Sequence, residues 1–188
     1  MNLPENDYHI LKLTDEFYHA YPNPPCKEIL KKKHRAYNCL LFQSHYDYFI
    51  CIPYRTEIRH PYAFHFTTTV RSKVHKSGLD YSKIVIIAKT DYIDSTDAII
   101  DKDEFNETMV NLERIKKEAL DFVEDYVAHM KGRRKLHKRE FERRYSFSPL
   151  KYFHNELKIN DSKHVTDPES ATTSQQEVAA TTDHPTIE

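Results

Sequence analysis

The sequence lacks the short motifs by which several large enzyme classes are recognised. It has no Walker A loop, no GxGxxG and no GxSxG, and only two of its 188 residues are glycine. Its twelve histidines include no HExxH or HxxxH pair, which would place two metal ligands on one face of a helix. Nucleotide-binding folds, nucleophile-elbow hydrolases and helix-borne metal centres therefore find no support.

Cysteine and long apolar runs are also scarce. The three cysteines, Cys26, Cys39 and Cys51, form no CxxC pair. Cys39 and Cys51 fall in apolar segments, where we expect buried free thiols that behave as small hydrophobic residues. An odd cysteine count without a secretory signal pattern is typical of a reducing cytoplasm. No apolar run approaches the roughly 18 residues of a membrane span.

The charge is small in total but unevenly distributed. The chain has a net charge of −1, and residues 161–188 hold six acidic residues and one lysine, which leaves +4 for residues 1–160. The acidic segment has no aromatic residue and few apolar ones, so we expect a disordered tail that follows a single domain at 1–160. A basic domain indicates an anionic partner such as nucleic acid.

Short strand-like segments occupy the first half of the chain. Tyr8–Leu13 alternates weakly, and Tyr37–Phe42 and Tyr48–Ile52 flank a polar turn, which predicts a hairpin that ends at Pro53. Residues 62–70 also alternate, and the basic residues 71–78 after them are expected to form a loop. Lys83–Ala88 is the most hydrophobic segment, so we expect it to be the central strand.

Helical patterns follow in the second half. Apolar residues recur at steps of three and four from Asp103 to Lys131, which predicts one long amphipathic helix that ends at Gly132. Ser148-Pro149 is typical of a helix start, and a last helix is expected to reach about Ile159. Strands followed by helices indicate an α+β fold, in which a strongly bent antiparallel sheet or small barrel is packed against helices.

The segment after the hairpin combines groups that could act on a phosphodiester. Arg55, Thr56, Arg59 and His60 lie within six residues, just beyond Pro53. Metal-independent RNA cleavage needs a base, an acid and cations that stabilise the phosphorane. Histidine titrates near neutral pH, and arginine binds phosphate with a planar fork. The alternative is a solvated loop whose arginines pair with Glu57.

Basic residues also cluster next to aromatic ones. Residues 131–144 hold eight Lys or Arg and two Glu, and Tyr145 and Phe147 follow them. Cations bind phosphates and aromatic rings stack on unpaired bases, so this combination favours single-stranded RNA as the ligand. A charged run can equally be a solvated helix face.

The order of these segments resembles the ToxN/AbiQ/TenpN family, the endoribonuclease toxins of type III toxin–antitoxin and phage-defence systems. In that family a basic residue, an alanine and an aromatic residue open one strand, as Arg35-Ala36-Tyr37 does here. The next strand ends in a Pro-x-Thr-Ser-like turn followed by a lysine, and Pro53-Tyr54-Arg55-Thr56 stands in that place with Arg59 after it. The Lys83–Ala88 strand and the Phe147-Ser148-x-Leu150 helix start are similar too.

The resemblance implies a chemistry and partners. It implies a barrel-like sheet and RNA cleavage without a metal or other cofactor, which leaves a 2′,3′-cyclic phosphate and a 5′-hydroxyl. It also implies inhibition by a repeated, pseudoknotted RNA antitoxin in a closed protein–RNA assembly.

We assign roles on this basis. Arg35, Arg55 and Arg59 are expected to stabilise the phosphate, Thr56 to orient it, and His60 to transfer a proton. The residues expected to bind RNA are Lys33, Tyr37, Arg71, Lys73, Lys76, Arg133, Arg134, Lys138, Arg139, Arg143, Arg144, Ser148 and Lys151. Two other hypotheses stay open: the chain could be a non-catalytic RNA-binding protein or a protein–protein interaction module.

Overall fold

A computed structural model describes residues 8–30, 39–44, 46–94, 96 and 98–160. The strands are β1 (Tyr8–Leu13), β2 (Cys39–Gln43), β3 (Phe49–Arg55), β4 (Ala63–His65), β5 (Gly78–Asp80), β6 (Val85–Ile87) and β7 (Ile93–Asp94). The α-helices are α1 (Asp15–Ala20), α2 (Val70–His75), α3 (Lys102–Val110), α4 (Leu112–Met130) and α5 (Lys138–Tyr145). Three 3-10 turns are η1 (Tyr81–Lys83), η2 (Thr90–Tyr92) and η3 (Pro149–Tyr152). The predicted acidic tail lies outside the described residues.

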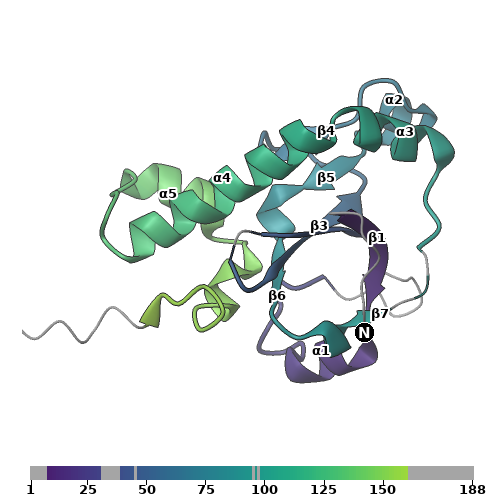
Figure 1. The fold of residues 1–188 in the computed structure, drawn as a ribbon. Helices are drawn as coiled ribbons and strands as arrows, with labels where there is room; N and C mark the ends of the chain where they lie inside the picture. The colour runs from purple at the N-terminus through teal and green to yellow at the C-terminus, as the bar shows by residue number, and fades with distance from the viewer. Residues whose placement is uncertain (1–7, 31–38, 45, 95, 97, 161–188) are drawn as a thin grey trace, which may run out of the picture.

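The seven strands form one antiparallel sheet, and the predicted α+β class is confirmed (Figure 1). The strand order is β4-β5-β3-β2-β1-β7, and β6 pairs with β3 outside this path. The sheet is bent but does not close into a barrel. The expectation that Lys83–Ala88 is the central strand is wrong, because β6 pairs only with β3, whereas β3 pairs with β2, β5 and β6.

Strand β3 does not end at Pro53, as the sequence predicted. It pairs with β6 through Cys51 and with β5 from Tyr54 onward, so β5 and β6 follow one another along the same edge. Pro53 has no N–H to donate, and it lies between the residues paired with β6 and those paired with β5. The strand therefore continues through the proline and carries Arg55 at its end.

The expectation of free thiols is wrong for two of the three cysteines. Cys39 on β2 and Cys51 on β3 form a disulfide, and their Cα atoms are 5.8 Å apart. The register places Cys39 opposite Pro53 and Leu41 opposite Cys51, so the two cysteines are diagonal neighbours on one face of the hairpin. Cys26 is buried and remains a free thiol.

The helical half of the chain is more divided than predicted. The single long helix is interrupted at Asn111, whose backbone (φ −109°, ψ 13°) leaves the helical region and separates α3 from α4. The loop expected at residues 71–78 is largely α2, because the Thr69 hydroxyl accepts from the Ser72 amide and caps the helix start. The last helix is only the short turn η3, although Ser148 caps it as expected.

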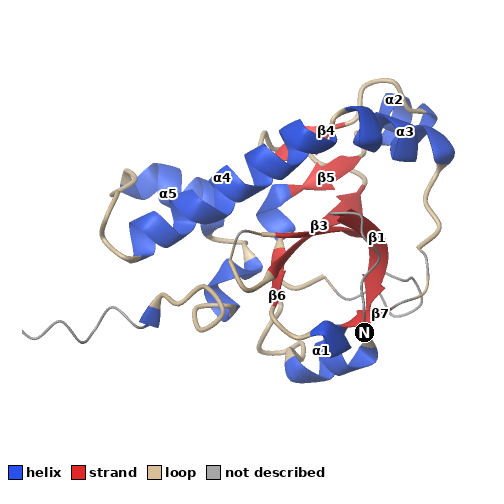
Figure 2. Ribbon diagram, in the orientation of Figure 1, coloured by secondary structure: helices blue, strands red, loops and turns tan. Residues whose placement is uncertain are grey.

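The sheet and α4 share one hydrophobic core. Helix α4 runs along one side of the strands and contributes Ile115, Ala119, Phe122, Val123 and Tyr126 to the buried set (Figure 2). Leu150, Phe153 and Leu157 of the last segment are also buried, as their spacing predicted. Among the described residues, no helix is both long and apolar enough to cross a membrane.

Gly78 supplies a test of the packing beside the end of β3. It lies opposite Arg55, and a Cβ added there would be 2.1 Å from the carbonyl oxygen of Phe64. Because backbone must move to relieve that overlap, we expect Gly78→Ala to lower the free energy of unfolding by about 2–3 kcal/mol or more. Urea denaturation measures the change.

Gly132→Ala is the matched control for this substitution. Gly132 has φ +71° and no atom within 4 Å of an added Cβ. The free energy of unfolding should therefore fall only through backbone strain, by about 1 kcal/mol. A loss at Gly78 no larger than the loss at Gly132 would contradict the described packing.

Candidate active site

A buried carboxylate lies at the end of β5. Asp80 is fully buried, and its carboxylate is in contact with the side chain of nearby Ser82 and with two side chains from earlier in the chain, Arg55 and His60. The Arg55 guanidinium forms an ion pair with Oδ2. Oδ1 accepts from the Ser82 hydroxyl at 2.6 Å and lies 3.5 Å from Nε2 of His60. Arg55 and His60, predicted as site residues, thus converge on a residue that the sequence analysis did not single out.

The strand pairing explains why these groups meet. Arg55 is the last residue of β3 and pairs with Gly78, so β5 delivers Asp80 two residues further on. The chain then leaves the sheet edge in η1, where Asp80 Oδ1 also accepts from the Ser82 amide and caps the turn. Asp80 is thus the last residue of β5, and Ser82 and Lys83 lie in the connection that leads to β6.

The surroundings of Asp80 favour its charged form. Burial raises the pKa of Asp80, but hydrogen bonds from His60 and Ser82 and the charge of Arg55 outweigh it. The pKa therefore lies below its usual value, and the carboxylate is ionised at neutral pH. A buried charge of this kind fixes the position of its partners, since each of them compensates part of the lost hydration.

His60 is held from several sides. Its Nε2 lies 3.2 Å from the Ser82 hydroxyl as well as near Asp80, and its ring stacks on Tyr62 with centroids 6.0 Å apart. The Nδ1 atom is buried and has no hydrogen-bond partner among the described residues. Nε2 is thus the nitrogen in polar contact, and the side chain as a whole is 34% exposed.

Lys83 adds a second cation to the cluster. Its ammonium donates to the carbonyl of Phe147 at 2.5 Å, which links η1 to the segment before η3. Burial lowers the pKa of Lys83, Asp80 raises it, and the charge of Arg55 lowers it further, with a net shift downward. The positive charge of Arg55 and the negative charge of Asp80 therefore both act on Lys83, which puts Lys83 in the electrostatic surroundings of the cluster.

The cluster is open to solvent on its cationic side. The Arg55 side chain is 29% exposed, and no second ion pair of its guanidinium is found within the described part of the chain. Phe147, whose backbone holds Lys83, is 74% exposed. A partly exposed guanidinium and a partly exposed imidazole thus meet at a buried carboxylate, an arrangement suited to binding an anionic ester and transferring a proton.

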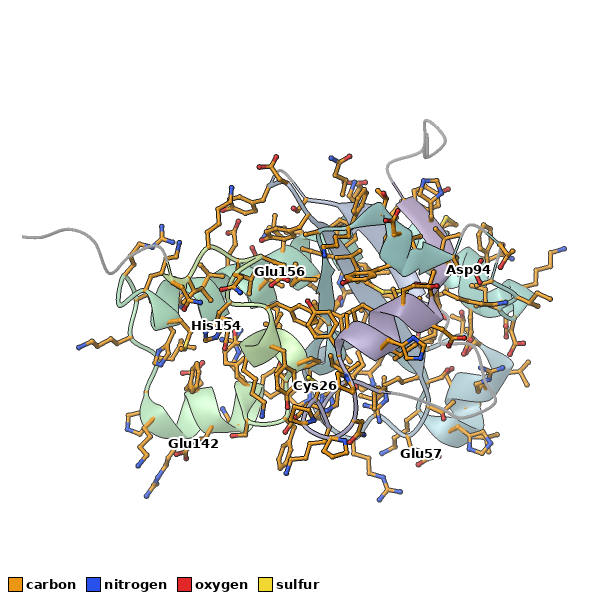
Figure 3. The ribbon with its side chains drawn as sticks, turned by 90° about the horizontal axis from the view of Figure 1, so that it is seen from below. Cys26, Glu57, Asp94, Glu142, His154 and Glu156 are labelled. Atoms are coloured by element: carbon orange, nitrogen blue, oxygen red, sulfur yellow. A yellow bond between two sulfur atoms is a disulfide. The ribbon has the colours of Figure 1, made fainter. Side chains whose placement is uncertain are left out.

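The other predicted catalytic residues do not join this cluster. Arg59 is 80% exposed and pairs with Glu57 at 3.3 Å, near the edge of the molecule (Figure 3). Arg59 therefore lies outside the Asp80 cluster, and its catalytic role stays a prediction. Thr56 has no side-chain hydrogen bond among the described residues, and Arg35 lies outside them.

Several residues predicted to bind RNA have partners within the protein. Arg71 pairs with Asp101 at 2.5 Å and Glu104 at 3.4 Å, and Lys151 pairs with buried Glu28 at 2.9 Å. Arg144 is only 15% exposed and pairs with Asp125 at 3.0 Å. Ser148 is buried, and its hydroxyl accepts from the Leu150 amide, so it cannot offer this helix start to a phosphate.

The remaining predicted cations lie on the surface. Arg143 is exposed and donates to the Tyr62 hydroxyl at 2.9 Å, and Arg134 pairs with Asp125 at 2.6 Å while its side chain stays 64% exposed. The other exposed members are Lys73, Lys76, Arg133, Lys138 and Arg139. Lys33 and Tyr37 fall outside the described residues.

The sequence did contain a signal for the residues that were missed. Asp80, Ser82 and Lys83 interrupt an apolar stretch that runs from Leu79 to Ile87. A charged residue in such a stretch needs a partner when it is buried, and Arg55 on the adjacent strand is one of the proposed cations. Only the strand register, however, places Arg55 opposite β5.

The pKa of Asp80 gives a test of this geometry. Because the folded-state pKa is lowered, Asp80 stabilises the fold above the unfolded-state pKa of about 3.9, and this contribution is lost as pH falls through the folded-state value. Urea denaturation between pH 7 and pH 3 should therefore show a smaller loss of unfolding free energy for Asp80→Asn than for the wild type. At pH 7 that variant should be about 2–3 kcal/mol less stable.

Two further variants accompany this comparison. Ser82→Ala removes one hydrogen bond that lowers the pKa of Asp80, so it should show part of the same effect. Asp47→Asn, at a carboxylate that is 95% exposed, should follow the wild-type curve. If the unfolding free energies of the wild type and Asp80→Asn fall by the same amount between pH 7 and pH 3, Asp80 does not carry the buried charge.

Comparisons with known proteins supply no relative that would name this site. No group of three or more His, Cys, Asp or Glu side chains arranged to hold a metal ion is found among the described residues. No protein-family model, no curated protein and no solved structure matches the chain. The cluster around Asp80 must therefore be interpreted from its own geometry.

Proposed function

We propose that the chain is an endoribonuclease that cleaves RNA by transesterification, without a metal. The observation that carries this proposal is the convergence of Arg55 and His60 on the buried Asp80. The charges of Asp80 and Arg55 also act on Lys83. The exposed side of the cluster offers positive charge and a proton-transfer group, which is what attack by a ribose 2′-hydroxyl requires.

The reaction can be assigned to named atoms. The 2′-oxygen bonds to phosphorus and the P–O5′ bond breaks. The proton of the 2′-hydroxyl passes to His60 Nε2, and the leaving 5′-oxygen takes up a proton from water. His60 Nε2 is the proposed proton-transfer atom, and it would exchange its contact with the Ser82 hydroxyl at 3.2 Å for one with the substrate. Arg55 and Lys83 would stabilise the charge on the phosphorane, and Asp80 would orient both His60 and Arg55.

The biological setting is proposed from the same resemblance that suggested the chemistry. The chain would be a cytoplasmic toxin of the ToxN/AbiQ/TenpN kind, held inactive by a repeated RNA antitoxin. The net charge of +4 on residues 1–160 supports an RNA partner.

A second candidate is an RNA-binding protein without catalytic activity. The contacts of His60 favour it, because Nδ1 is buried and Nε2 already faces Ser82 and Asp80. In that case Arg55, Asp80 and His60 would be a structural network, and the exposed cations alone would bind RNA.

Arg55 and Arg59 provide a matched pair of substitutions for the test. They lie four residues apart and carry the same charge, but only Arg55 contacts Asp80. We expect Arg55→Ala to slow cleavage of a labelled RNA at least about 100-fold, in EDTA, whereas Arg59→Ala stays within about threefold of the wild type. Arg55→Lys keeps a charge beside Asp80 but loses the planar fork, so it should also be slow while it remains folded.

His60 separates the two candidates. If His60 transfers a proton, His60→Gln should slow cleavage about 100-fold or more without changing RNA affinity, and His75→Gln, at an exposed histidine paired with Glu57, should have no effect. An RNA that binds the wild type with steep salt dependence but is never cleaved would overturn the ribonuclease proposal and leave the second candidate.

A further inference from the structure

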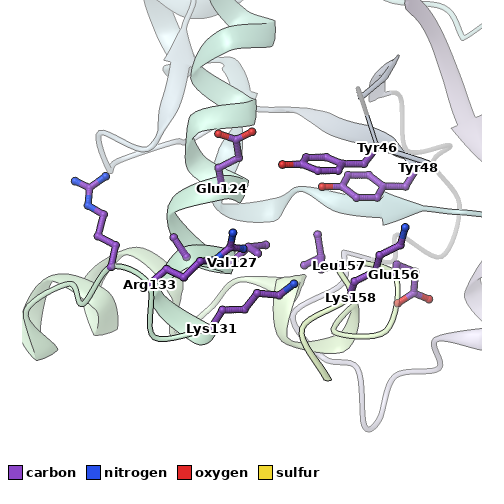
Figure 4. Close-up of a pocket in the computed structure, with 11 residues that line it drawn as sticks. Tyr46, Tyr48, Glu124, Val127, Lys131, Arg133, Glu156, Leu157 and Lys158 are labelled. Atoms are coloured by element: carbon purple, nitrogen blue, oxygen red, sulfur yellow. The ribbon is translucent and has the colours of Figure 1, made fainter. Parts of the chain in front are cut away.

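A second concave surface lies at the opposite end of β3 from Asp80. It is a hollow of about 590 Å³ between the turn before β3, the end of α4 and the last described segment (Figure 4). Its size is within the roughly 300–1,000 Å³ that is usual for small-molecule sites. None of the residues in its lining belongs to the Asp80 cluster. The hollow therefore needs an explanation of its own.

Two stacked tyrosines form one wall of this hollow. The rings of Tyr46 and Tyr48 are nearly parallel, at 16°, with centroids 5.5 Å apart. Tyr46 is 43% exposed, whereas Tyr48 is buried and anchors the pair in the core. Leu157 lies across the hollow from the rings (Figure 4). An aromatic wall opposite an apolar side chain is suited to a flat, planar group.

Cations and carboxylates complete the lining. Lys131 and Arg133 extend from the end of α4 toward the hollow, and Lys158 borders its other side (Figure 4). Glu124 and Glu156 also line it, and Glu156 accepts from the Tyr21 hydroxyl at 2.9 Å. A ligand that is only anionic would be repelled by the two glutamates. The lining suits a ligand with a flat apolar part, hydrogen-bond donors and a phosphate.

We propose that this hollow binds one unpaired nucleotide of an RNA strand. The base would stack on the tyrosine wall, the phosphate would lie against Lys131, Arg133 and Lys158, and a carboxylate would accept from a ribose hydroxyl or a base amino group. The proposal deepens the proposed function and rests on it for the identity of the strand.

The position of the hollow fits a strand that also reaches the Asp80 cluster. Tyr48 directly precedes β3, and Arg55 ends it, so the two features are separated by the length of one seven-residue strand, roughly 20 Å. A single strand of RNA could therefore contact both ends of β3. One of its bases would be bound in the hollow, and the phosphodiester of another nucleotide would lie at Arg55.

Binding measurements can test the site separately from cleavage. Fluorescence anisotropy of a labelled ten-nucleotide single-stranded RNA is measured in the Arg55→Ala chain, which removes the proposed chemistry. Tyr46→Leu and Lys131→Gln should each weaken binding about tenfold. Lys135→Gln is the matched control, because Lys135 is exposed on the same turn and does not line the hollow, and it should change the affinity less than twofold.

Competitors identify what the hollow recognises. Unlabelled AMP or UMP should displace the RNA weakly, and the displacement should be lost in Tyr46→Leu, while inorganic phosphate should not compete at the same concentration. Equal competition by phosphate, or RNA affinity unchanged in both Tyr46→Leu and Lys131→Gln, would overturn the nucleotide site. A mononucleotide that binds the hollow without displacing the RNA would overturn its assignment to a strand.

The two proposals fail in different ways. RNA binding that depends on Tyr46 and Lys131, without any cleavage by the wild type, would refute the ribonuclease and retain the nucleotide site. Cleavage that depends on Arg55, together with RNA affinity that is unchanged in Tyr46→Leu and Lys131→Gln, would refute the nucleotide site and retain the ribonuclease.

Discussion

The burial of one carboxylate, that of Asp80, organises the end of the sheet where we place the active site. A charge without access to water is stable only if hydrogen bonds and opposite charges replace its hydration. Asp80 obtains these from Arg55 at the end of β3, from Ser82 in η1 and from His60 in the connection to β4. The carboxylate thereby links the end of β3, the turn η1 and the connection before β4.

Strand β3 carries this constraint through the rest of the molecule. It pairs with β2 along one edge and with β5 and β6 in succession along the other, and the pairing of Arg55 with Gly78 of β5 brings Asp80 beside Arg55. At its other end, Tyr48 anchors the aromatic wall of the hollow. The distance between the two proposed RNA contacts is thus set by the length of one strand.

The sequence predicted the elements whose signals are local. Strand β1, the hairpin and the Ser148 cap follow from alternation, turn residues and capping, which act over a few residues. Residues 62–70 were expected to be one strand, but the strand β4 is only Ala63–His65, and Thr69 caps the start of α2. Pro53 was misread because its effect depends on where the neighbouring strands change, and that information lies about 30 residues away.

The candidate site could be predicted only in part, for the same reason. Arg55 and His60 stand close together in the sequence, so their composition indicated a site, whereas Asp80 joins them only through strand register. The basic residues were harder to assign, since the sequence does not show which of them already form ion pairs within the protein. Arg59 faces solvent, and Arg144 is enclosed by Phe122, Tyr145 and Asp125, although both looked like ligands for phosphate.

The chemical nature of the cleavage products tests the central claim most directly. A synthetic RNA incubated with the wild-type chain in EDTA should yield fragments that end in a 2′,3′-cyclic phosphate and begin with a 5′-hydroxyl, as mass spectrometry would show. A single 2′-deoxy substitution at the cleaved position should prevent the cut, because it removes the attacking oxygen. Fragments with a 3′-hydroxyl and a 5′-phosphate, or a cut at the deoxy position, would contradict the proposed transesterification at Arg55, His60 and Lys83.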